Sequence, residues 1–169
     1  MFFNPLDKLN EMMDILKEFD PKLRRKTDVG YESLETDTDL CIEILRPGFD
    51  DPSKGLLILC EGEGFFSMWL DWFMWAFFLE KEYEALCQTA LDVLNNRICV
   101  VKLRCLADGA EVGGAAIRSD DLGRPLRELC PDFWEYDAFL ERITLGEFEV
   151  CYTFWDSSLN KTEIVSFRE

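Results

Sequence analysis

The stretch GFFSMWLDWFMWAFFLE, residues 64–80, constrains the fold of this chain more than any other. It holds three Trp and five Phe, and Asp71 is its only charge before Glu80. A membrane-spanning helix needs about 20 apolar residues. The uncharged run from Trp72 to Leu79 has only eight, and acids rather than bases flank it. With no basic flank to orient it in a bilayer, the stretch indicates a strand of a folded protein.

Alternation along a single strand predicts two different faces for this stretch. One face would be wholly apolar and pack on the core, with Phe66, Met68, Leu70, Trp72 and Met74. The other would mix polar groups with large rings, with Ser67, Trp69, Asp71, Phe73 and Trp75. Either the N-terminal helix or a late loop covers this second face, or it is exposed. Because an exposed aromatic patch usually marks an interface, we predict partner contacts at Trp69, Asp71 and Trp75.

The net charge defines the class of partner. The chain has 34 acidic and 18 basic residues among 169, a net charge of −16. A field of this sign repels phosphate backbones and anionic membrane surfaces, and it attracts basic proteins. We therefore expect a basic protein as the partner, with no nucleic acid and no membrane bound.

Cysteine and histidine content limits the chemistry. Seven Cys occur at scattered spacings without a CxxC motif, which is typical of reduced thiols in a cytoplasmic protein. The first residues lack the pattern of a secretory signal. Because His is absent, Ser-His-Asp catalysis and His-ligated zinc are excluded. We expect a cytoplasmic protein that is not an enzyme and has no cofactor and no metal site.

The order of predicted elements indicates an α+β fold. Apolar periodicity and turn residues predict helices over residues 5–19 and 80–95, with short helices between 120 and 143. They predict strands at 40–45, 55–62, 97–106, 110–119, 147–156 and 161–167, besides the aromatic strand that follows Gly64. Gly113–Gly114 is expected to be a bulge or a point of close approach. We expect a mostly antiparallel sheet of about seven strands with helices on one face. Residues 1–27 would form an amphipathic helix and a basic linker, and residues 28–169 a single domain.

Two segments concentrate the acidic charge. Residues 28–63 carry ten acids and two bases, and residues 128–149 carry seven acids and one base. The second segment interleaves acids with rings in CPDFWEYDAFLE, which suits recognition of a basic protein. The alternative is an amphipathic helix whose rings face the core. The first reading predicts further partner contacts at Asp132, Trp134, Glu135, Tyr136 and Asp137.

A resemblance to a known protein family also indicates a partner-binding protein. The run EGEGFFSMWLDWFMWAFF, followed by a Glu-rich helix and VLNNRICVVKL, resembles small immunity proteins of bacterial polymorphic toxin systems. In that group a comparable strand carries a Trp-His-x-His-aromatic signature, which matches Trp72, Phe73, Met74, Trp75 and Phe77 here. Both His are replaced, so no role attached to them carries over. The resemblance covers residues 40–167, including a similar closing hairpin, and implies a toxin-neutralising binder.

These observations predict a non-enzymatic acidic protein that neutralises a basic partner, such as a nuclease-like toxin, by occluding its active site. One alternative is a nucleic-acid-mimicking inhibitor of phage type. Another is a small-molecule or carbohydrate binding module that uses the Trp-rich strand as a stacking platform.

Overall fold

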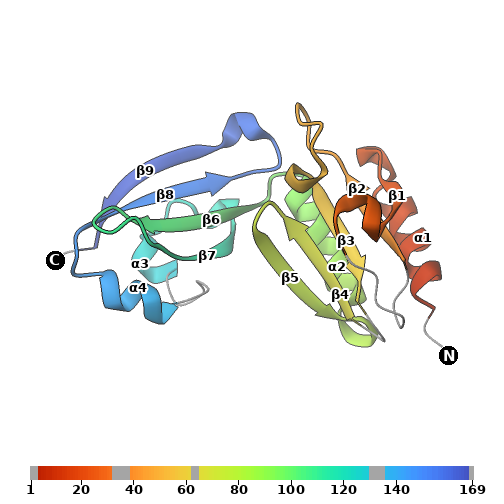
Figure 1. Ribbon diagram of the computed structural model, residues 1–169, viewed down its shortest axis with the longest axis horizontal. Coiled ribbons are helices and arrows are strands. Elements are labelled where there is room, and N and C mark those ends of the chain that lie inside the picture. Colours follow the sequence, from red (N-terminus) through yellow and green to blue (C-terminus); the bar gives the residue numbers. More distant parts are fainter. Residues whose placement is uncertain (1–3, 32–38, 62–64, 130–135, 168–169) are drawn as a thin grey trace. The chain divides into compact units, whose positions relative to one another are not determined.

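The strands pair into two separate antiparallel sheets. The computed structural model describes residues 4–31, 39–61, 65–129 and 136–167. In this part of the chain the strand orders are β1-β2-β3-β4-β5 and β7-β6-β8-β9 (Figure 1). The expected α+β class is confirmed, and the strands divide between two sheets of five and four. The chain splits into two compact units, residues 1–94 and 95–169, called here the first and second units.

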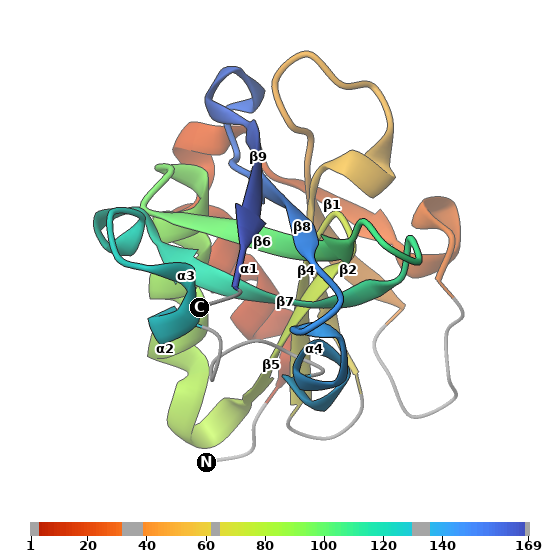
Figure 2. The same ribbon diagram turned by 90° about the vertical axis from the view of Figure 1, so that its left-hand side faces the viewer.

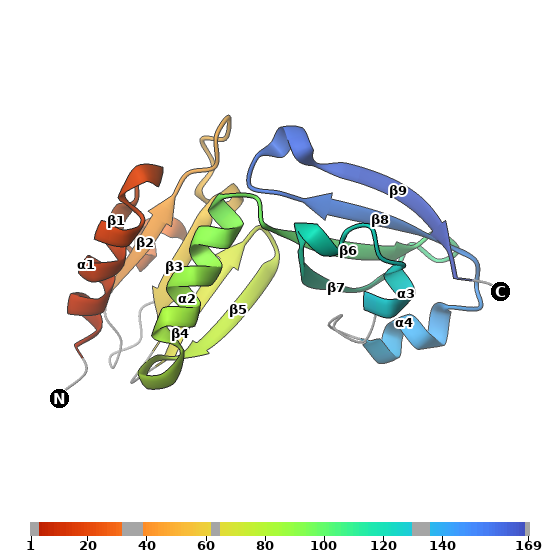
Figure 3. The same ribbon diagram turned by 180° about the vertical axis from the view of Figure 1, so that it is seen from behind.

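The first unit holds the five-stranded sheet and two long helices. Its helices are α1 (Pro5–Ile15), η1 (Lys17–Phe19), η2 (Lys26–Val29), η3 (Pro52–Lys54) and α2 (Leu79–Leu94). Its strands are β1 (Lys22–Arg25), β2 (Leu40–Ile44), β3 (Leu56–Cys60), β4 (Phe65–Leu70) and β5 (Phe73–Phe78). Figure 3 shows α1 and α2 on the same face of this sheet.

Helix α1 begins as its sequence predicts. The Asn4 side chain accepts a hydrogen bond from the Leu6 backbone N–H at 3.1 Å, which caps the helix. Its buried stripe consists of Leu9, Met12 and Leu16. Helix α1 packs on β2, and α2 packs on β4 and β5. This face of the sheet therefore carries the core of the first unit.

The aromatic stretch is a hairpin, which corrects the prediction of one continuous strand. Strand β4 ends at Leu70, and β5 begins at Phe73 and pairs antiparallel with it. Asp71 takes the left-handed conformation at φ 55°, which Asp tolerates better than most residues. Phe66, Met68 and Leu70 are fully buried on the helix-covered face, as predicted. Beyond the turn, Phe73 lies on the helix-covered face, because it pairs with Leu70 and paired residues share a side of the sheet. The alternation in β5 is therefore the reverse of the one predicted for a continuous strand.

The segment 22–26 also differs from its prediction as a linker. Lys22–Arg25 forms β1, which pairs antiparallel with β2 along the edge of the sheet. The four side chains of β1 are exposed. This exposure explains why the sequence of the segment is typical of a solvent-exposed linker. The N-terminal helix and this strand belong to the first unit, which ends at Leu94.

The second unit is a twisted four-stranded sheet with short helices (Figure 2). Its strands are β6 (Ile98–Cys105), β7 (Glu111–Arg118), β8 (Glu147–Thr153) and β9 (Lys161–Ser166). Its helices are η4 (Ser119–Asp121), α3 (Leu126–Leu129), α4 (Tyr136–Arg142) and η6 (Ser157–Leu159). The pairing of β6 with β7 shifts register between Leu103 and Arg104, opposite Gly113. Strand β7 therefore has one extra residue, Val112, directly before the predicted position Gly113–Gly114.

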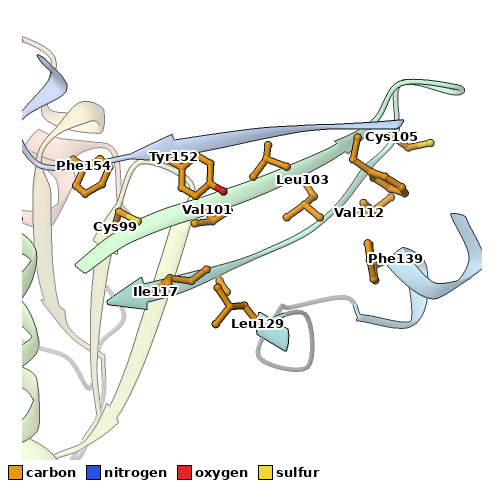
Figure 4. Close-up of a cluster of buried hydrophobic side chains, with 13 residues drawn as sticks. Cys99, Val101, Leu103, Cys105, Val112, Ile117, Leu129, Phe139, Tyr152 and Phe154 are labelled. Atoms are coloured by element: carbon orange, nitrogen blue, oxygen red, sulfur yellow. The ribbon is translucent and has the colours of Figure 1, made fainter. Parts of the chain in front are cut away.

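One face of the second sheet carries its hydrophobic core (Figure 4). Cys99, Val101, Leu103 and Cys105 of β6 point into it, as their alternation predicts. Phe139 of α4 is buried there, with its ring centroid 5.5 Å from Phe148. A cysteine-rich core needs no disulfide here, and the six described cysteines form none. No helix in the described part of the chain is both long and apolar enough to cross a membrane.

Candidate interaction face of the first sheet

The sheet face opposite α1 and α2 has a small core of its own. Cys41 of β2 and Leu57 and Leu59 of β3 are buried on this side. Val29 and Tyr31, which follow β1 in the chain, pack against them together with Trp69. The segment that covers this part of the face is therefore residues 26–31, and neither the N-terminal helix nor a late loop is needed for it.

Charged groups lie inside this cover. Lys26 is only 2% exposed, and its Nζ donates to the Cys60 carbonyl oxygen at 2.5 Å. The buried Glu43 carboxylate accepts from Arg24 Nε at 2.7 Å. Burial, followed by the charge of Glu43, raises the pKa of the Cys41 thiol to about 11. Charged groups are buried in proteins when they have hydrogen-bonding or charged partners. The contacts of Lys26 with Cys60 and of Arg24 with Glu43 therefore hold residues 22–31 against the sheet.

A polar chain anchors Trp69. Its indole N–H donates to Ser67 Oγ at 3.0 Å, and the Ser67 hydroxyl donates to the Glu61 carboxylate. The Trp69 and Tyr31 ring centroids are 6.1 Å apart. Burial raises the pKa of the Tyr31 phenol, and the charge of Glu61 adds to this shift. Trp69 is therefore half-buried and oriented by internal partners.

Beyond Trp69 the helix-free face carries apolar side chains with far less cover. We define the outer patch as Phe65, Trp69, Met74, Ala76 and Phe78, which the register of β4 and β5 places on one side. Phe78 is 67% exposed, and its ring lies 5.7 Å from that of Phe65. Met74 lies beside Trp69. Ala76 and Phe78 are exposed, and Phe65, Trp69 and Met74 are half-buried. An apolar group of this kind that is partly open to solvent is a candidate interaction site.

The hairpin tip gathers a second group of rings. The Phe73 ring lies 5.6 Å from Trp72 and 4.6 Å from Trp75, both in edge-to-face contact. All three are half-buried. Beside them, Lys54 Nζ donates to the Asp71 carboxylate at 2.9 Å. This carboxylate thus has a partner within the first unit, and it stabilises the turn.

Three of the predicted contact residues lie on the hairpin but do not form one patch. Trp69 lies on the helix-free face, whereas Trp75 shares the opposite face with Met68. The prediction that Trp69, Phe73 and Trp75 share a face is wrong, because the chain reverses at Asp71 and Phe73 pairs with Leu70, on the side of the sheet opposite Trp69. The outer patch therefore contains Trp69 and not Trp75.

The other predicted contacts belong to the second unit. Asp132, Trp134 and Glu135 lie outside the described residues. Tyr136 is the first residue of α4, and the Asp137 side chain in its first turn is exposed. Phe139, in the same segment, is buried against Phe148. The alternative of an amphipathic helix is therefore confirmed for Phe139, whereas Asp137 stays a predicted contact.

Sequence reasoning missed an acidic surface on the helices of the first unit. Asp7, Glu11, Asp14 and Glu18 follow one another at spacings of four, three and four, and all are exposed. Glu11 pairs with Lys8 at 2.5 Å. Helix α2 contacts α1 here, since the Tyr83 hydroxyl donates to the Lys8 carbonyl oxygen at 3.3 Å. The helical spacing of these acids was the signal that could have predicted this surface.

Charge divides unequally between the units. Residues 1–94 contain twenty acids and nine bases, a net charge of −11 out of the total of −16. Among the described residues, no group of three or more Cys, Asp or Glu side chains is arranged to hold a metal ion. Two cavities, of about 390 and 490 Å³, lie in the second unit, and no Trp lines either of them.

Comparison with known proteins adds no further assignment. No protein-family model, curated protein or solved structure matches this chain.

Proposed function

We propose that this chain is a non-enzymatic acidic protein that binds a basic protein and neutralises it by occluding its active site, as an immunity-type inhibitor of a nuclease-like toxin does. The observation that carries the proposal is the outer patch. Phe78 is 67% exposed beside Phe65, on a unit with a net charge of −11.

Each component of this face supports a different step of binding. Apolar rings that become fully desolvated supply most of the binding energy at protein interfaces. Surplus negative charge attracts a basic partner over a distance and makes association fast and sensitive to salt. Phe78 and Phe65 are the anchors in this scheme, and Trp69 adds a preoriented edge.

A nuclease is the favoured class of basic partner because its active site must itself attract phosphates. A protein whose acids take the place of those phosphates competes for the same basic groups. Asp137 of the second unit stays a predicted second contact. The six described cysteines form no disulfide, which agrees with a cytoplasmic site of action, where such a toxin would be met.

The alternative of a carbohydrate module receives less support. A sugar site needs a concave pocket lined by rings, and neither of the two cavities contains a Trp. The Trp69 indole N–H already donates to Ser67 Oγ, so it is not available as a polar contact for a ligand.

The test compares the wild type with Phe78→Asp in affinity capture from lysate of the native organism, eluted by a salt gradient. We expect a basic protein to bind the wild type, to elute with salt and to lose at least tenfold in affinity for Phe78→Asp. Mixed with the purified wild type at equal concentration, that protein should lose its enzymatic activity.

Ile164→Asp is the matched control, because Ile164 is an exposed apolar residue of β9 in the second unit. It should bind like the wild type. Equal retention of the partner by the wild type and Phe78→Asp would reject the outer patch. A captured basic protein that keeps full activity in the complex would reject neutralisation.

A further inference from the structure

The second unit contains a cavity that the proposed function does not use. It has a volume of about 390 Å³ and lies between the segment 122–126 and the ends of β8 and β9. Its walls combine five apolar side chains, those of Leu122, Pro125, Leu126, Val165 and Phe167, with the polar residues Arg124, Tyr152, Glu163 and Ser166. This volume is in the range of sites for small organic ligands.

One corner of the cavity is polar and well ordered. The Tyr152 hydroxyl donates to the Glu163 carboxylate at 2.5 Å. Tyr152 is only 3% exposed and is part of the core of the second unit (Figure 4), so its ring cannot turn away. Burial and the contact with Glu163 raise the pKa of the phenol, which keeps it protonated as a donor. Glu163 is thereby fixed at the cavity wall, and its side chain is 42% exposed.

A cation from the chain itself, Lys161, lies beside this corner but is not part of the cavity lining. Lys161 Nζ lies 4.2 Å from the centroid of the Tyr152 ring and 4.0 Å from a Glu163 carboxylate oxygen. A ring face combined with a carboxylate is a favourable environment for an ammonium group. The Lys161 side chain is 46% exposed, so water can take up its charge if another cation displaces it.

The remaining charged wall residue does not oppose a cationic ligand. Arg124 lines the cavity, but its guanidinium group lies 3.4 Å from both the Asp121 and the Glu128 carboxylates. Its positive charge is thus matched by two acids. An anionic ligand would have to compete with these two carboxylates for Arg124 and would also face Glu163.

We propose that this cavity binds a small organic cation with an apolar body, such as an aromatic primary amine. Its ammonium group lies against Glu163 and the Tyr152 ring, where it competes with Lys161 for the Glu163 carboxylate. Its apolar body lies between Leu126 and the side chains of Val165 and Phe167.

The place of β9 at the edge of its sheet offers a second explanation for the charged residues Lys161 and Glu163. Strand β9 is at the edge of its sheet, and inward-pointing Lys and Glu residues discourage pairing with other strands. That role needs only the two charges. It requires neither the hydrogen bond from Tyr152 nor an apolar cavity next to Glu163, and it predicts no affinity for amines.

The experiment titrates the full chain with 2-phenylethylamine and, in parallel, with its neutral analogue 2-phenylethanol, followed by NMR chemical shifts. We expect saturable shifts for residues around the cavity with the amine and at least tenfold weaker binding of the alcohol. Glu163→Gln keeps an acceptor for Tyr152 and should weaken amine binding at least tenfold. Lys161→Met removes the internal competitor and should strengthen it about threefold. Glu147→Gln, an exposed acid outside this cavity, should have no effect.

Equal binding of amine and alcohol would overturn the proposal, because the cavity would then be a simple apolar cleft. Unchanged amine affinity in Lys161→Met would overturn it as well, even if Glu163→Gln fails to fold. A third probe, N-acetyl-lysine amide, separates the source of the cation. If it binds more tightly than the aromatic amine, the site recognises a protein side chain and not a small free amine.

Discussion

Lys54 and Asp71 form an ion pair of 2.9 Å beside the tip of the β4–β5 hairpin. Asp71 is at the same time the residue with φ 55° that reverses the chain between the two strands. Asp71 thus has two roles. Its backbone conformation forms the turn, and its carboxylate contacts the loop before β3 through Lys54. The two roles predict different costs for different substitutions.

Replacing Asp71 separates the turn from the ion pair. Asp71→Asn keeps a residue that tolerates the left-handed region and should cost less than about 1 kcal/mol, since an ion pair that is partly open to solvent contributes little. Asp71→Val adds backbone strain and should cost about 2 kcal/mol or more. Urea denaturation of both variants measures the difference. Equal losses in the two variants would show that the backbone conformation is not what the turn requires.

Ser67 links Glu61 to Trp69 while it is fully buried. Ser67→Ala leaves the Trp69 indole N–H without its acceptor and should cost about 1–3 kcal/mol. The emission of Trp69 should also change, because its environment becomes less well ordered. Ser157→Ala, at an exposed serine of η6, is the control and should stay within about 0.5 kcal/mol of the wild type. A neutral Ser67→Ala would mean that water replaces the hydroxyl.

The Cys41 thiol should make the stability depend on pH at the alkaline end. Its folded pKa of about 11 lies above the unfolded value of 9.0, so the folded state holds this proton more tightly. The contribution is complete below pH 9 and is lost as the pH rises from 9 to 11. Two pKa units correspond to about 3 kcal/mol. Denaturation of the wild type and Cys41→Ala at pH 8 and pH 11 should give a smaller loss for the variant. Parallel losses would show that other groups dominate.

Phe139 should decide whether α4 stays docked on the second sheet. It is 1% exposed, and its ring centroid lies 4.9 Å from Phe167. A helix of seven residues is not stable alone. Phe139→Ala should therefore cost about 3–5 kcal/mol and speed amide exchange in α4. Leu140→Ala, at an exposed neighbour, should leave exchange in α4 unchanged. Slow exchange in Phe139→Ala would mean that other contacts hold the helix.

Local patterns in the sequence determined much of the architecture. The cap at Asn4, the alternation in β6 and the bulge opposite Leu103 each depend on interactions within one element or one pair of strands. Such interactions leave a periodicity that can be read directly. The net charge is likewise a property of composition, and so is the expectation of a basic partner.

Tertiary structure decided what composition leaves open. In the sequence, Asp71 is one polar position in an apolar run. Only its backbone conformation in the structure shows that the chain turns there. Phe65 and Phe78 become neighbours because that turn fixes the register of β4 and β5. Residues 22–25 read as a linker, yet they pair as a strand because β2 offers an open edge. The cavity at Tyr152 and Glu163 likewise depends on residues brought together by the hairpin of β8 and β9 and by the segment 122–126. Periodicity reports burial along one element, whereas register and long-range contacts depend on which elements meet.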